Sequence, residues 1–134
     1  MKKALSVVAG VIAGGLTVFI VEAIGHVIWP PPEGVDLSDP ESLATLMDIA
    51  PFGALVAVVV AWIVGAVAGG FVAGKISADP GYLPSILTGG VLMIFGVLTM
   101  MSFPHPIWMW VLGIVAPVPS AWYGGRLAGH GNLE

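Results

Sequence analysis

Three side chains with the potential for chemistry stand in otherwise apolar stretches of the sequence: Glu22, His26 and His105. Glu22 and His26 are four residues apart, so on a helix their side chains share one face. His105 lies between two prolines. An ionised carboxylate is costly inside a bilayer, so we expect Glu22 to face other helices, to be paired or to be protonated.

Three interpretations of this cluster are open. Glu22 and His26 could be hydrogen-bonded structural groups, because buried polar groups are usually satisfied. Glu22 could instead titrate in a proton- or cation-coupled site, with the acidic segment 30–50 attracting cations. Finally, His26, His105 and Glu22 could ligate a divalent metal such as Zn²⁺, which accepts imidazole and carboxylate ligands.

The composition restricts the classes of protein that these residues can serve. Of the 134 residues, 57% are hydrophobic and 9% are charged, whereas a soluble domain carries about 25% charged residues. This excludes a soluble globule, a disordered chain and a nucleic-acid-binding protein. The chain has no cysteine, which excludes disulfides, thiolate metal sites and cysteine nucleophiles. We see no catalytic motif and expect neither an enzyme nor a bound cofactor.

The elements that must position the cluster are four long apolar stretches. They cover residues 4–29, 51–74, 83–103 and 107–127. Each is close to the roughly 20 residues that a helix needs to cross a bilayer core. The sequence therefore predicts one all-α membrane domain over 1–134, a bundle of four transmembrane helices in two antiparallel hairpins.

The charges predict the orientation of this bundle. The four cationic residues are Lys2, Lys3, Lys75 and Arg126. An even number of spans places all of them on one side, while segment 30–50 has acidic residues and no Lys or Arg. The positive-inside rule then places both termini in the cytoplasm. The interfacial aromatic residues that we expect are Trp29, Trp108 and Trp110 outside and Tyr82 inside.

The connections between the spans differ in length and type. Within the outer loop 30–50, Ser38-Asp39-Pro40-Glu41 matches a capping box with proline at the first helical position. We predict a short interfacial helix over 40–49. The inner connection is predicted to be a loop with a turn at Asp79-Pro80-Gly81, and Pro104-His105-Pro106 to be a tight outer corner. His130 is expected in a solvated tail.

Small residues recur at every fourth position on several spans, which lets helix backbones approach closely in lipid. The predicted packing residues are Gly10, Gly14, Ala61, Gly65, Gly69, Ala73 and Gly125. The second span carries a further row, Ala66, Gly70 and Gly74. One row could pack within the chain and the other against a second copy in a homo-oligomer.

The last span contains Pro117 and Pro119, which lack the N–H groups that would bond to the carbonyls of Gly113 and Val115. We predict a kink at membrane depth. The free carbonyls there would be hydrogen-bonded by Ser120, by a neighbouring helix or by a ligand. Broken helices near the midplane form binding sites in many transporters. The candidate ligand or proton site therefore includes Gly113, Val115 and Pro117 beside Glu22, His26 and His105.

Some segments also resemble known families. Glu22-Ala23-Ile24-Gly25-His26, Pro30-Pro31-Pro32 and Pro104-His105-Pro106-Ile107-Trp108 resemble a family of small bacterial four-helix membrane proteins of unknown activity. This resemblance implies the topology and a bacterial inner membrane. A weaker resemblance is to small multidrug resistance transporters and rests on Glu22-Ala23-Ile24-Gly25. It implies proton-coupled export at Glu22. The long outer loop departs from that pattern.

The sequence thus predicts a small integral membrane protein that acts as a structural or accessory component through helix packing. The first alternative is a small proton- or cation-coupled transporter or channel that uses Glu22. The second is a protein that binds a divalent metal through Glu22, His26 and His105. The expected partners are the lipid bilayer and a second copy of the chain, with no nucleic acid.

Overall fold

The chain forms an all-helical bundle in a computed structural model that describes residues 2–30, 32–34, 36, 38–77, 82–102 and 104–129. The helices are α1 (Lys2–Ile28), α2 (Pro40–Ile49), α3 (Phe52–Ser77), α4 (Leu83–Ser102), α5 (Ile107–Val115) and α6 (Pro117–Leu127). Helices α1, α3 and α4 and the α5–α6 stretch are each long and apolar enough to cross a membrane. The predicted multi-pass all-α fold is confirmed.

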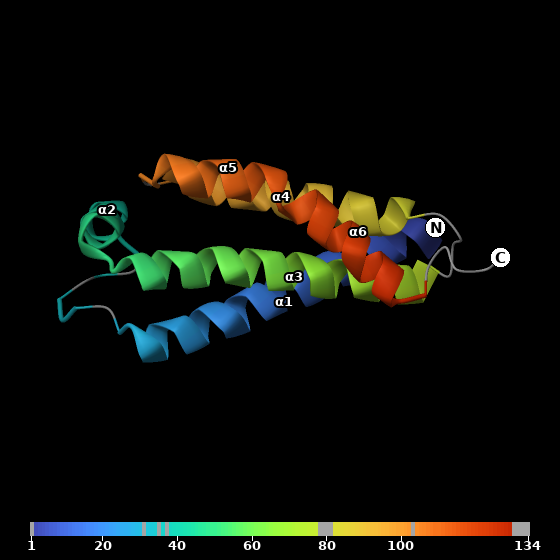
Figure 1. Cartoon of the computed structure of the whole chain (residues 1–134), viewed down its shortest axis with the longest axis horizontal. Coiled ribbons are helices and arrows are strands. Elements are labelled where there is room, and N and C mark those ends of the chain that lie inside the picture. Colours follow the sequence, from blue (N-terminus) through green and yellow to red (C-terminus); the bar gives the residue numbers. More distant parts are fainter. Residues whose placement is uncertain are drawn as a thin grey trace.

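The charges are separated along the bundle. Helix α1 begins and α6 ends at one end, which we name the inner end, while α2 lies at the opposite, outer end (Figure 1). The basic residues Lys2, Lys3, Lys75 and Arg126 belong to the inner ends of their helices. The outer loop and α2 carry Glu33, Asp36, Asp39, Glu41 and Asp48. The two ends therefore differ in sign.

Helix α3 packs against α1 through glycines. A Cβ atom added at Gly10 would lie 2.6 Å from the carbonyl oxygen of Gly69, and one at Gly14 would lie 2.9 Å from that of Gly65. Only glycine allows the two backbones to approach this closely. The predicted packing residues Gly10, Gly14, Ala61, Gly65, Gly69, Ala73 and Gly125 are all buried.

The second row of small residues on α3 packs against α6. Gly70 contacts the backbone of Ala121, and a Cβ at Gly74 would lie 3.3 Å from the Cα of Gly125. From α4, the Ser85 hydroxyl donates a 2.8 Å hydrogen bond to the Gly70 carbonyl. Both rows are therefore used within one chain, which makes α3 the central helix and leaves neither row free for a second copy.

The fourth span is broken, as the prolines predict. Helix α5 ends at Val115 and α6 begins at Pro117. Ala116 still donates its N–H to Leu112 at 2.9 Å, but Pro117 has no N–H for the Gly113 carbonyl. In Figure 1, α6 leaves the direction of α5 and crosses towards the inner end of α3.

The outer loop contains the predicted short helix, and its cap differs by one residue from the predicted capping box. Asp39 is the N-cap of α2 and accepts the Ser42 N–H at 3.4 Å, with Pro40 in the first turn. Ser38 instead donates its N–H and hydroxyl to the Asp36 carboxylate. The capping box fails because α2 begins at Pro40, so Asp39 and not Ser38 occupies the N-cap position. The predicted turn at 79–81, Phe103 at the end of the predicted third span, and His130 lie outside the described residues.

Candidate ligand-binding site

Helix α1 is tightly packed along its inner half and loosely packed along its outer half. On α1 the buried residues are Ser6, Gly10 and Gly14, all in the inner half. Towards the outer end, α1 diverges from the α4–α5 side of the bundle (Figure 1). Two cavities lie beside α1, one at its outer half and one along the stretch from Val11 to Glu22.

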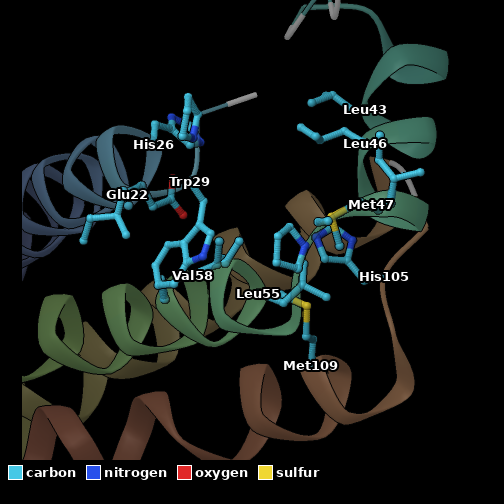
Figure 2. A pocket seen from close by; sticks show the side chains of 18 of the residues that line it. Glu22, His26, Trp29, Leu43, Leu46, Met47, Leu55, Val58, His105 and Met109 are labelled. Carbon is cyan, nitrogen blue, oxygen red and sulfur yellow. The ribbon is translucent and has the colours of Figure 1, made fainter. Parts of the chain in front are cut away.

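The larger hollow, which we name the outer cavity, has a volume of about 640 Å³. Figure 2 shows the α1 side chains on one side, the α2 side chains Leu43, Leu46 and Met47 on another, and His105 near Leu55 and Met109 opposite α1. Met47 packs against the buried cluster of Leu55, Val59 and Met109. Helix α2 is therefore a wall of the cavity at the outer end.

A second cavity, which we name the slot, has a volume of about 420 Å³ and lies between the facing sides of α1 and α4. Its apolar lining includes Val11 and Val18 from α1 and Leu92 and Phe95 from α4. Glu22, Trp62 and Thr99 line both the slot and the outer cavity. These three residues mark the junction of the two spaces.

Glu22 has two side-chain partners at this junction. Its carboxylate accepts a hydrogen bond from the Trp62 side chain and interacts electrostatically with His26, one helical turn away. Trp62 is itself held on the opposite side, since a Cβ at Gly113 of α5 would lie 3.2 Å from its ring. The polar group thus lies between α1 and α3 and is oriented by an indole that α5 supports.

Glu22, His26 and His105 all line the outer cavity, but they do not form a metal-ligand set. Among the described residues, no group of three or more His, Cys, Asp or Glu side chains could hold a metal ion. His26 is on α1 and His105 is on the opposite side of the cavity (Figure 2). In this arrangement Glu22, His26 and His105 do not meet the requirement that all ligands lie within about 2 Å of one ion.

The residues at the helix break have different positions. Gly113 and Pro117 are buried and line the slot. Val115 is 60% exposed and lines neither cavity. The structure thus brings two of the three predicted break residues to the same space as Glu22.

The residues of the site that sequence reasoning missed include Trp62, Thr99, Gly15 and Gly96. One signal was available for Trp62, which lies ten residues into α3, about 15 Å along the helix. A tryptophan so far from the interfaces needs an acceptor for its N–H. Nothing in the sequence distinguishes Gly15 and Gly96 from the packing glycines.

The electrostatics of the site favour cations. Among the described residues that line the two cavities, Glu22 is the only carboxylate, and none is Lys or Arg. In the loop before α2, hydrogen bonds from Ser38 lower the pKa of exposed Asp36 below the ordinary value for an aspartate. The outer end of the bundle, where the outer cavity lies, thus carries negative charge.

No family model, curated protein or solved structure matches this chain.

Proposed function

We propose that this integral membrane protein is a small proton-coupled carrier that binds a monovalent organic cation at Glu22. One observation carries the proposal: Glu22 lies at the junction of the outer cavity and the slot, where it lines both. A carboxylate at membrane depth is costly, and for that reason it marks a functional site by default. Here it lies beside about 640 Å³ of space that a ligand can fill.

The cavity walls support an organic cation rather than a hydrated metal ion. The lining is mostly apolar, with the aromatic rings of Trp29 and Trp62, and aromatic faces attract cations. The described residues offer no group of ligands for a metal. An organic cation needs one counter-charge and apolar contacts, and this cavity supplies both.

Coupling of cation binding to a proton follows from the same carboxylate. A protonated Glu22 has no charge for the cation, while an ionised Glu22 binds it, so the two compete for one site. The inner half of the bundle is closed by glycine contacts such as Gly10 against Gly69, and access is from the outer half. Transport would therefore require a second arrangement in which Glu22 is reached from the inner end.

The charge separation supports the proposed location. All four Lys and Arg residues belong to the inner ends of the spans, as the positive-inside rule requires for cytoplasmic termini. We therefore place the inner end in the cytoplasm of a bacterial inner membrane. The acidic outer loop then faces the compartment from which cations enter. The proposed transport involves no catalytic step.

Binding of tetraphenylphosphonium by the purified protein tests the proposal. By isothermal titration we expect the wild-type affinity to increase with pH as Glu22 ionises. Glu22→Gln should lower the affinity at least about tenfold and remove the pH dependence, because two opposite unit charges about 6 Å apart attract by about 3 kcal/mol at an effective dielectric constant of about 20. Its melting temperature should be unchanged, since the amide keeps an acceptor for Trp62.

The matched control is Glu33→Gln, the same change at an exposed acid outside both cavities. This variant should bind like the wild type. Equal binding by the wild type and Glu22→Gln would refute a site at Glu22. In vesicles, an imposed proton gradient should drive cation flux in the wild type and not in Glu22→Gln.

The accessory function predicted from small-residue helix faces has less support. Both rows on α3 are buried against α1 and α6 of the same chain. A role in binding another protein would have to use a different surface. Under that alternative, Glu22→Gln would leave the function intact, so the experiment separates the two.

A further inference from the structure

The slot differs in character from the outer cavity. Its polar lining groups, Glu22, Trp62 and Thr99, are those that it shares with the outer cavity. The rest of its lining is apolar or glycine. A ligand group that enters the slot from Glu22 therefore meets hydrocarbon and glycine backbone.

Two glycines on facing helices keep the slot empty. Gly15 of α1 and Gly96 of α4 both line it, and a Cβ atom at either would meet nothing within 4 Å. Gly14, the neighbour of Gly15, is different, because a Cβ there would lie 2.8 Å from Leu92. Gly14 permits helix contact, whereas Gly15 and Gly96 leave open space between the helices.

The dimensions of the slot fit one narrow chain. The α1 residues that line it run from Val11 to Glu22, about 16 Å at 1.5 Å per residue. A volume of about 420 Å³ over that length gives a mean cross-section of about 26 Å². A helix about 10 Å wide needs about 80 Å², so a helix of a second copy does not fit.

The slot is also accessible from the side. Phe95 on its α4 wall is 55% exposed, and Gly15 on its α1 wall is exposed. In a bilayer these residues face the hydrocarbon core. An alkyl chain dissolved in the membrane can therefore enter between α1 and α4 without crossing the polar outer end.

We propose that the slot binds an unbranched alkyl chain whose cationic head group lies at Glu22, so that the ligand is a single-chain amphiphile. Gly15 and Gly96 are then the residues that determine which chains are accepted. Charge complementarity selects the head group, since Glu22 at the outer end of the slot would repel a carboxylate or phosphate. This inference rests on the cation site proposed above and adds a separate subsite to it.

The test uses dodecylammonium that carries a diazirine on its last carbon, with the protein in lipid nanodiscs. Photolysis followed by peptide mass spectrometry should place the label on the inner part of the slot, near Val11 and Leu92. Gly96→Leu and Gly15→Leu should each reduce this labelling at least fivefold. The matched control is Gly90→Leu, because Gly90 of α4 is equally open but lies outside the slot.

Displacement of bound tetraphenylphosphonium provides a second readout. In the wild type, dodecylammonium should displace it at least tenfold more effectively than methylammonium. Gly96→Leu should remove this difference by weakening displacement by dodecylammonium, while displacement by methylammonium should stay as in the wild type. Labels spread over the lipid-facing surface, or a Gly96→Leu variant that keeps the wild-type pattern, would overturn the alkyl subsite.

The two proposals fail in distinguishable ways. If Glu22→Gln has no effect on cation binding, but a neutral dodecanol diazirine still labels the slot and Gly96→Leu blocks it, the cation site is wrong and the subsite stands. If tetraphenylphosphonium binds through Glu22 without any dependence on chain length, the subsite is wrong and the cation site stands.

Discussion

At the scale of single residues, chemistry depends on what each polar side chain meets. Glu22 accepts a hydrogen bond from Trp62 and interacts with His26, and it opens onto two cavities. Thr99 lines both cavities, yet its hydroxyl donates to the Phe95 carbonyl of its own helix at 2.9 Å. Within this junction, Glu22 is therefore the group with charge to offer a ligand.

The exposed turn before α2 allows a direct test of one electrostatic assignment. Ser38 donates two hydrogen bonds to the Asp36 carboxylate, which lower the pKa of Asp36. A lowered pKa means that this interaction stabilises the turn above the ordinary aspartate pKa and is lost as the pH falls through the lowered value. Ser38→Ala should therefore raise the pKa of Asp36 in an NMR titration. An unchanged titration curve would contradict the assignment.

At the scale of helices, α3 organises the bundle. It presents one row of small residues to α1 and another to α6, while Ser85 of α4 is bonded to it. Since lipid supplies no hydrophobic force between helices, backbone approach through small residues provides the contact. The outer half of α1 lacks buried residues, and there the cavities form.

Two substitutions that introduce the same side chain should differ in their effect on helix packing. Gly69→Leu places its Cβ 2.7 Å from the Gly10 carbonyl oxygen, so the backbones must separate at a cost of about 1–3 kcal/mol or more. Gly15→Leu meets open space and replaces a poor helix former. We expect a lower melting temperature for Gly69→Leu and no loss for Gly15→Leu. Equal melting temperatures would show that the α1–α3 contact is not as close as described.

At the scale of the whole molecule, the separation of charge determines the expected topology. The chain has no cysteine, so single cysteines report position without background. Ser38 and Leu127 are both exposed and lie at opposite ends of the bundle. A membrane-impermeant maleimide added to intact cells should label Ser38→Cys and should label Leu127→Cys only after lysis. Labelling of both in intact cells would contradict the proposed orientation.

Local features of the sequence determined the elements. Runs of apolar residues determined the four spans because each is long enough to cross the hydrocarbon core. Pro117 determined the break between α5 and α6 because it removes a backbone donor. Pro40 marked the start of α2. Each of these properties belongs to a short segment and does not depend on which helices become neighbours.

The tertiary structure alone decided how the elements form a site. Adjacent glycines on α1 differ by about 100° around the helix, so Gly14 packs on α3 and α4 while Gly15 faces the slot. Trp62 meets Glu22 because α1 and α3 lie side by side there, forty residues apart in sequence. His26 and His105 stay on opposite sides of the outer cavity because α1 diverges from the α4–α5 side. Helix spacing depends on every contact along the bundle, so no single segment of the sequence encodes it.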